Sequence, residues 1–148
     1  MVLLVVLAGR FASSQITNEI ELTRSVVQSQ RQAIVEAALN LTESESAGFW
    51  PLYQSYRKDM ARLEDRSVEL ITEYAESYDI LTEEQAESML QEHLDIQQGE
   101  LKIRQKYLKP FRKVLPPMKL TRFYQVENKM DVVIDYELAL EIPLIPED

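Results

Sequence analysis

The sequence predicts an all-α protein with four helices and a long central antiparallel hairpin. Only three glycines occur among the 148 residues, so the chemistry of tight turns is scarce. Apolar residues recur at three- and four-residue steps over long stretches, which is typical of amphipathic helices. Two of these stretches begin with a capping box, LTESE at residues 41–45 and LTEEQ at residues 81–85. Because the boxes lie forty residues apart, each is expected to begin one arm of a helical hairpin.

The first nine residues form a short apolar run, MVLLVVLAG, followed by Arg10 and the small residues Ala12, Ser13 and Ser14. The run is too short to span a bilayer, which needs about 20 apolar residues. It fits the end of a secretory signal whose basic leader is missing because the start codon was assigned too late. The alternative is a strand or helix packed into the core. We expect residues 1–14 to be a signal-peptide remnant and residues 15–148 to form a single helical domain in the periplasm.

The first helix is expected from about residue 17 to residue 39. A line of apolar residues recurs every seven positions along it, with two valines beside the line: Ile20, Val27, Ile34 and Leu41, with Val26 and Val35. The triplet Asn-Leu-Thr at residues 40–42 should end this helix and begin the next one.

The second helix is expected from about residue 43 to residue 78. Its apolar face contains Phe49, Tyr53, Tyr56, Met60, Leu63, Leu70 and Tyr74. Pro51 either kinks this helix or begins it, with residues 43–49 forming a separate short turn. Trp50 beside it is interpreted as a core residue, the alternative being a platform for a ligand.

The third helix is expected from about residue 83 to residue 114, with a bend at Pro110. Two apolar lines lie side by side on it: Met89, Ile96, Ile103 and Tyr107, and next to them Leu90, Leu94, Leu101, Leu108 and Leu115. Together they cover roughly half of the helix surface, which is more than one neighbouring helix needs. We therefore expect this helix to contact two partners. One is its hairpin mate, and the other is either another helix or a second copy of the chain, so a homodimer is expected. Glu100 and Arg104 lie within this surface at i,i+4 spacing, either fixing the register of an interface or forming an exposed pair.

The fourth helix is expected from about residue 119 to residue 141, after the stop formed by Pro116 and Pro117. One face of it contains Phe123, Val126, Met130, Val133 and Leu140. Pro143 and Pro146 should leave the remaining residues as an extended tail.

The net charge of −9 is unevenly distributed along the chain. Residues 62–100 carry twelve acids and two bases, whereas residues 101–122 carry eight bases and no acid. Proteins that bind nucleic acid are usually basic overall, so nucleic acid is not expected as a partner. The basic segment either pairs with its acidic neighbours or steers an acidic protein partner. The residues expected to bind a partner are Leu101, Arg104, Lys106, Leu108, Arg112 and Lys113.

The sequence offers little of the chemistry that catalysis or metal binding needs. There is no cysteine, which excludes disulfides, thiolate metal sites and cysteine nucleophiles. His93 is the one histidine, and Met89 and Gln97 hold the positions one turn away where a second metal ligand would be needed. We interpret His93 as a packed core residue, with metal binding as the alternative. No phosphate-binding glycine loop or dinucleotide motif occurs, so we expect neither an enzyme nor a cofactor.

The two capping segments resemble a family motif. LTEEQ at residues 81–85 matches the Leu-Thr-x-x-Gln motif of the Spy/CpxP family, and LTESE at residues 41–45 matches it with glutamate in the last position. The resemblance covers residues 25–142, and the run QVENK at residues 125–129 is also similar to uncharacterised exported proteobacterial proteins. It implies a small periplasmic helical protein that forms a cradle-shaped antiparallel dimer and acts as an ATP-independent chaperone or as a stress and metal sensor.

Two functions follow from the residues and the resemblance together. The first is a non-catalytic periplasmic protein that binds unfolded clients, or an envelope-stress signalling partner, on an apolar and basic surface. The alternative is a regulatory or metal-responsive sensor subunit with a specific protein partner. Neither function involves stable insertion into the membrane.

Overall fold

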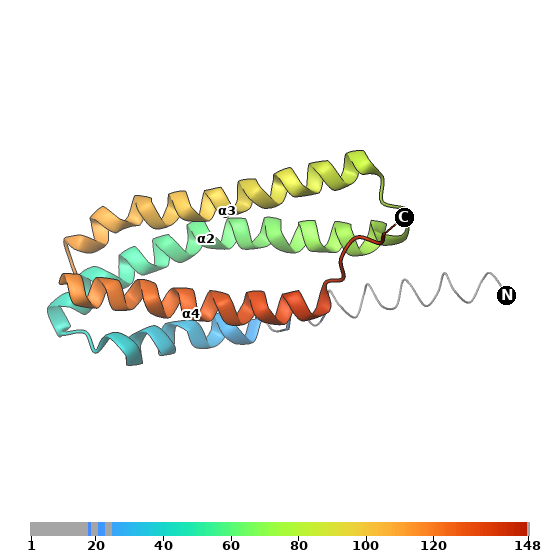
Figure 1. Cartoon of the computed structure of the whole chain (residues 1–148). Coiled ribbons are helices and arrows are strands. Elements are labelled where there is room, and N and C mark those ends of the chain that lie inside the picture. Colours follow the sequence, from blue (N-terminus) through green and yellow to red (C-terminus); the bar gives the residue numbers. More distant parts are fainter. Residues whose placement is uncertain (1–17, 19–20, 23–24, 148) are drawn as a thin grey trace.

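The computed structural model describes residues 18, 21–22 and 25–147, and within these residues it is all-α with no strand. A helical segment over residues 25–39 is followed by α2 (Glu43–Ser77), the short 3₁₀ helix η1 (Tyr78–Ile80), α3 (Glu83–Arg112) and α4 (Pro117–Glu141). Consecutive helices run in opposite directions, and α2 and α3 form the long hairpin (Figure 1). The all-α prediction with a central hairpin is confirmed. The expectations for residues 1–14 and for Ile20 fall outside the described residues.

Both capping boxes form, and they set the first residues of α2 and α3. The backbone N–H of Glu45 donates to Oγ1 of Thr42 at 3.2 Å, and the backbone N–H of Thr42 donates to Oε2 of Glu45 at 2.8 Å. The corresponding distances between Gln85 and Thr82 are 3.2 and 3.0 Å. Each pair satisfies two backbone groups that a helix end would otherwise leave without partners.

The remaining helix ends agree with the sequence to within a few residues. Asn40 ends the first helix in the left-handed region, with a φ of 45°. Pro51 lies inside α2, which is continuous from Glu43, so the alternative of a separate short turn before it is wrong. The fourth helix begins at Pro117 rather than residue 119, because proline fits the first turn of a helix without losing a backbone hydrogen bond.

The core is aromatic and lies at one end of the bundle, near the turn between α3 and α4. Phe49 contacts Phe111 and Phe123 with ring centroids 5.5 and 5.2 Å apart, and Phe111 and Phe123 are 4.9 Å apart. Trp50 packs partly buried against this cluster, 5.0 Å from the Phe49 ring, which agrees with its interpretation as a core residue. We call this end the aromatic half of the bundle.

The predictions of which apolar residues are buried are wrong in part for the first helix and for α4. In the first helix the buried side chains are Arg31, Val35 and Leu39, whereas Ile34 of the predicted line is exposed. In α4 the buried line ends at Met130, and Val133 and Leu140 are exposed. In the first helix the sequence spacing defines a face but not its rotation toward the neighbouring helices. In α4 the predicted face loses its neighbour, because α3 diverges from α4 toward the C-terminal end of α4.

Away from the aromatic half the core becomes thin. Beyond Met130, α4 buries none of its described side chains, and α3 buries only Ile96 among the residues that precede Tyr107. Figure 1 shows the reason, since α3 and α4 lie close at their connecting turn and spread apart toward the other end of the molecule. We call this end the open half.

The chain leaves α4 as an extended tail, as expected, and returns to the end of α2. The hydroxyl of Tyr74 donates to the backbone oxygen of Pro143, and the hydroxyl of Tyr78 donates to that of Leu144, both at 2.9 Å. The tail therefore lies next to the hairpin turn between α2 and α3 (Figure 1).

Candidate binding site

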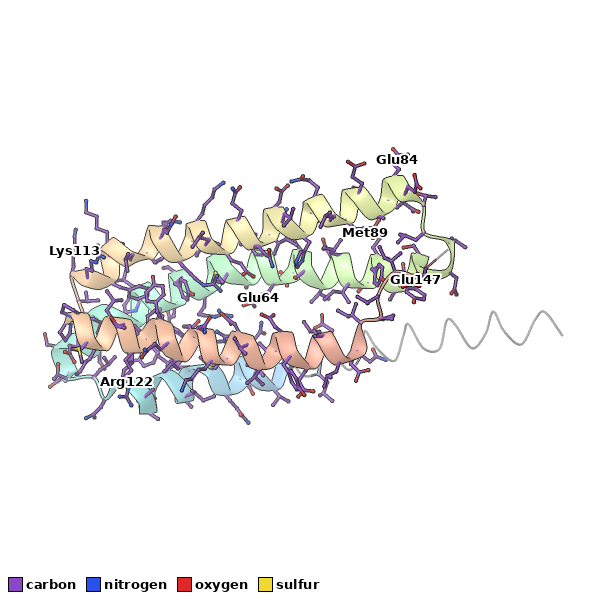
Figure 2. The ribbon with its side chains drawn as sticks, viewed as in Figure 1. Glu64, Glu84, Met89, Lys113, Arg122 and Glu147 are labelled. Atoms are coloured by element: carbon purple, nitrogen blue, oxygen red, sulfur yellow. The ribbon has the colours of Figure 1, made fainter. Side chains whose placement is uncertain are left out.

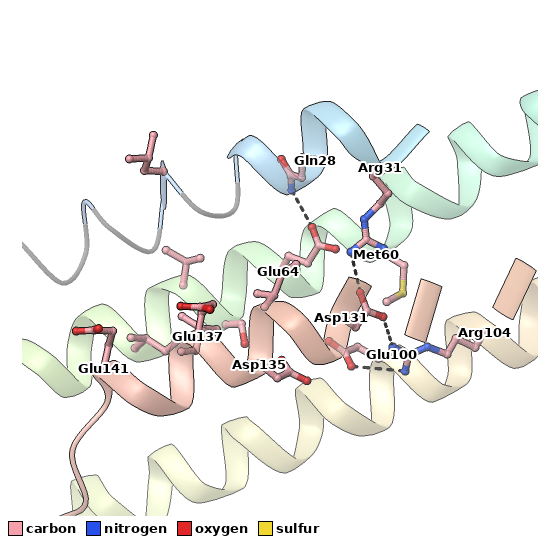
Figure 3. Close-up of a pocket in the computed structure, with 16 residues that line it drawn as sticks. Gln28, Arg31, Met60, Glu64, Glu100, Arg104, Asp131, Asp135, Glu137 and Glu141 are labelled. Atoms are coloured by element: carbon pink, nitrogen blue, oxygen red, sulfur yellow. Dashed lines mark hydrogen bonds and ion pairs between the residues drawn. The ribbon is translucent and has the colours of Figure 1, made fainter. Parts of the chain in front are cut away.

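A cavity of about 320 Å³ lies in the open half, between α2, α3 and α4, with residues of the first helix at its edge. We call it the open-end cavity. Its apolar wall consists of Met60, Val68 and Ile71 from α2 and Ile134 and Leu138 from α4. Its charged residues are Arg31, Arg104, Glu64, Glu100, Asp131, Asp135, Glu137 and Glu141. Figure 3 shows these side chains converging from the surrounding helices.

The end of the cavity nearest the aromatic half is closed by an ion-pair network. Arg31 donates to Glu127 and to Asp131, each at 2.8 Å, and the Arg31 side chain is almost completely buried. Arg104 of α3 donates to the other oxygen of Asp131 at 3.1 Å and lies 3.6 Å from Glu100. Asp131 thus joins two guanidinium groups from different helices (Figure 3). Arg104, which also pairs with Glu100 on its own helix, consequently links α3 to α4 through Asp131 within one chain.

The electrostatics of this network follow from its burial. Burial lowers the pKa of Arg31, but the charges of Glu127 and Asp131 outweigh it and leave that pKa above its ordinary value. Burial raises the pKa of Glu127, with Arg31 and Arg57 opposing the change. Burial also raises the pKa of Glu100, against the charge of Arg104. The network is therefore held together by opposite charges that compensate one another away from water.

The other end of the cavity carries carboxylates without such compensation. Asp135, Glu137 and Glu141 follow one another along α4 toward its C-terminal end (Figure 3). None of the three forms an ion pair within 4 Å among the described residues. Partial burial and the charge of Asp131 raise the pKa of Asp135. The described residues consequently give this part of the cavity a negative potential next to an apolar wall.

The structure places the six predicted partner-binding residues in four different environments. Arg104 points into the open-end cavity, and Lys106 pairs with Asp59 of α2 at 2.7 Å. Leu108 and Arg112 line a second, shallower hollow between the end of α3 and the start of α4. Leu101 on α3 and Lys113, the residue that follows α3, are exposed. The six residues therefore do not form one site, although Leu101, Leu108 and Arg112 follow one line along α3.

That line is part of a longer apolar feature, which we call the α3 stripe: Leu90, Leu94, Leu101 and Leu108. The first three of these leucines keep 59%, 48% and 53% of their surface exposed. The other predicted line of α3 faces α2, where Ile96 and Tyr107 are buried. The stripe ends at Arg112 and Lys113, and Figure 2 shows Lys113 pointing away from the bundle at this end of α3.

The basic segment is only partly neutralised by its acidic neighbours. Arg104, Lys106 and Lys119 form ion pairs with Asp131, Asp59 and Glu45, respectively. The Lys106 ammonium and the Tyr107 hydroxyl both donate to Asp59, and these bonds lower the pKa of that carboxyl group. Lys109, Arg112, Lys113 and Arg122 form no ion pair among the residues that the structure describes.

The interpretation of His93 as a packed core residue is wrong. Its side chain is exposed in the open half, where α3 has separated from α4. Its charge acts on Asp135, whose pKa it lowers. Among the described residues no group of three or more histidine, aspartate or glutamate side chains is arranged to hold a metal ion.

Sequence reasoning missed the residues that shape the cavity. Arg31, Glu127 and Asp131 come from the first and fourth helices, and charged residues on those helices are expected to face solvent. One signal was present in the sequence. Positions 27, 31, 35 and 39 follow one another at four-residue steps, and Arg31 is the one charged residue among Val27, Val35 and Leu39.

Comparison of the chain with protein-family models, with curated proteins and with solved structures finds no match. The resemblance to the Spy/CpxP family therefore stays a prediction, and the two motif segments are explained by the caps that they form. No described helix is both long enough and apolar enough to cross a lipid bilayer.

Proposed function

We propose that the protein is a non-catalytic periplasmic binding protein that holds unfolded or amphipathic segments of other proteins against the α3 stripe. The observation that carries the proposal is the exposure of Leu90, Leu94 and Leu101 in series on one helix. Aligned apolar side chains at helical spacing are the usual means by which one protein surface receives an amphipathic segment of another. A stripe from Leu90 to Arg112 is about 33 Å long at the rise of an α-helix, which is enough for six or so turns of a bound helix.

Charge gives the surface a preference among clients. Lys109, Arg112 and Lys113 lie at one end of the stripe without intramolecular ion pairs among the described residues. An acidic segment placed there gains long-range attraction, while the leucines contribute contact that is independent of sequence. The proposed client is therefore an unfolded protein segment with apolar and acidic residues.

The proposal is tested by light scattering of reduced α-lactalbumin, an acidic protein that aggregates when its disulfides are cleaved. Wild-type protein should delay aggregation, and the double variant L94S/L101S should delay it much less. The double variant Q98S/Q105S on the same helix is the matched control, because glutamine and leucine have similar helix propensities. No delay by the wild-type protein, or an equal delay by L94S/L101S, would contradict the proposal.

The contribution of charge to client binding is tested at basic residues that form no ion pair among the described residues. The double variant R112E/K113E should weaken the effect, whereas K58E/K129E changes two exposed bases elsewhere and should leave it unchanged. Reversal of Lys106 is less informative, since it also removes the ion pair with Asp59.

Two related expectations are tested with the same proteins. A homodimer through α3 would cover the stripe that clients need, so light scattering after size exclusion separates the two uses of this surface. A dimer that L94S/L101S converts to a monomer would assign the stripe to the interface, whereas a monomeric wild-type protein leaves it open for clients. Cell fractionation should place the protein in the periplasm, and retention in the cytoplasm would contradict export.

The alternative function, a regulatory or metal-responsive sensor subunit, predicts different results. It requires capture of one specific partner and no general effect on aggregation. Its metal-responsive form requires heat on calorimetric titration with zinc, which H93A abolishes.

A further inference from the structure

The open-end cavity has a chemistry of its own, distinct from that of the α3 stripe. Its walls combine aliphatic side chains from two helices, such as Val68 and Ile134, with six carboxylates and two guanidinium groups. Its volume of about 320 Å³ lies at the lower end of the range in which proteins bind small organic molecules. The apolar walls and the charges face the same space, so an occupant needs both an apolar part and a charged part.

The sign of that charge follows from how the carboxylates are distributed. Both guanidinium groups, of Arg31 and Arg104, are already used by Asp131 and its neighbours at the inner end. The carboxylates nearer the open end have no cationic partner of their own among the described residues. An anionic occupant would meet repulsion there, whereas a cation would take the place of the missing partner.

We propose that the open-end cavity binds a small organic cation with an apolar body, such as an alkylammonium ion. The ammonium group lies beside Asp135 of α4, which forms no ion pair among the described residues, and faces Glu100 of α3, whose pair with Arg104 is long at 3.6 Å. The alkyl part lies against Val68, Ile71, Ile134 and Leu138.

Two other observations favour this occupant over a bare ion. No group of three or more histidine, aspartate or glutamate side chains among the described residues is arranged to hold a metal ion. Glu100 of α3 and Asp135 of α4 line the same cavity, and the charge of Asp135 contributes to the raised pKa of Glu100, so both carboxylates act on the space between these helices. A compact polyamine would use the carboxylates but would leave the apolar wall in contact with water.

The experiment is calorimetric titration of the full chain with octylammonium, octanoate and spermidine at low ionic strength. Octylammonium should bind, octanoate should give no saturable heat, and spermidine should bind roughly tenfold more weakly. Shortening the probe from octylammonium to hexylammonium should weaken binding by roughly tenfold, because two buried methylene groups are lost. Equal binding of octylammonium and octanoate, or of octylammonium and spermidine, would overturn the proposal.

Variants locate the site. E100Q and D135N should each weaken octylammonium binding by roughly tenfold, as expected when a partly buried ion pair loses one member. E84Q is the matched control, since Glu84 points away from the bundle at the far end of α3 (Figure 2). V68F changes no charge but fills part of the cavity, and it should remove octylammonium binding. Equal affinities of E100Q, D135N, V68F and E84Q for octylammonium would show that the ligand binds elsewhere. Thermal unfolding of all four variants establishes that each is folded.

Discussion

Arg31 and Glu127 form an ion pair at 2.8 Å in which both side chains are almost entirely buried, with 3% and 2% of their surface exposed. Glu127 has a second cation, Arg57, at 3.5 Å, and Arg31 has a second carboxylate, Asp131. The first helix is thereby joined to α4 by a polar contact at the border between the aromatic half and the open half of the bundle.

Removing Arg31 should destabilise the protein strongly. R31A leaves the carboxylate of Glu127 buried with only the longer contact to Arg57, and loss of one member of a buried pair costs about 3–5 kcal/mol. The free energy of unfolding in urea measures this loss. The double variant R31M/E127L should recover most of it, because two apolar side chains replace the pair. The exposed R62A serves as control and should change stability by less than about 0.5 kcal/mol. Equal losses in R31A and R31M/E127L would contradict this account of the pair.

The two capping boxes should contribute separately to stability. T42A and T82A each remove a side-chain acceptor from a helix start and should each cost about 1 kcal/mol. T42S and T82S keep the hydroxyl and should stay close to wild type. Because the two caps begin different helices, the losses should add in T42A/T82A, as determined by urea unfolding. A loss in T82S as large as that in T82A would show that the methyl group matters more than the cap.

Two glycines mark close contacts between helices, and they should respond differently to alanine. A Cβ atom at Gly48 would lie 2.7 Å from Cγ1 of Val114, whereas one at Gly99 would lie 3.0 Å from Cδ1 of Leu63. Valine is stiff, so G48A should destabilise by about 1 kcal/mol despite the better helix propensity of alanine. The end of the Leu63 side chain can move, so G99A should stay within about 0.5 kcal/mol of wild type. Thermal unfolding distinguishes G48A from G99A. If a clash with Val114 causes the loss in G48A, the double variant G48A/V114A should melt at a higher temperature than G48A, and a melting temperature no higher would contradict that cause.

The helix boundaries show how much of this fold is readable from sequence. Thr82 and Gln85 identify a helix start because capping depends on residues three positions apart, and the structure forms that cap as expected. The all-α class and the hairpin follow from such local rules. The prediction for Leu140 failed because exposure depends on where a neighbouring helix lies, and α3 has diverged from α4 at that point.

The candidate site was much less predictable than the fold. Of the six residues that the sequence singled out, only Arg104 lines the cavity, and Arg31, Asp131 and Asp135 come to it from the first and fourth helices. From their hydropathy such residues are expected to face solvent. Burial of a charged side chain costs free energy unless it is paired, and the ion pair between Arg31 and Glu127 exists only in the folded structure. Leu101 was correctly assigned to an apolar line, but the sequence could not show that Leu90, Leu94 and Leu101 stay exposed while Leu115 at the end of the same line is buried.

Asp135 should make stability depend on pH in a direction opposite to that of ordinary acid unfolding. Its pKa is raised above the ordinary value of 3.8 by partial burial and by Asp131, so its ionised form is less favourable in the folded state than in the unfolded state. That cost is fully present at pH 7 and disappears as the pH falls below 3.8, where the group is protonated in both states. D135N should therefore raise the melting temperature at pH 7 and give no such gain at pH 3. The same change at the exposed Asp79 should give no comparable gain at either pH, and a lower melting temperature of D135N at pH 7 would contradict the assignment.

The gathering of aromatic side chains at one end has a consequence for hydrogen exchange of the backbone amides. Amides of α2 near Tyr56 lie within the packed cluster and should exchange only through global unfolding. Amides of α4 beyond Ile134 belong to a part of the helix with no buried side chain among its described residues, so they should exchange through local opening. The open half is then expected to open locally while the aromatic half keeps the four helices in register.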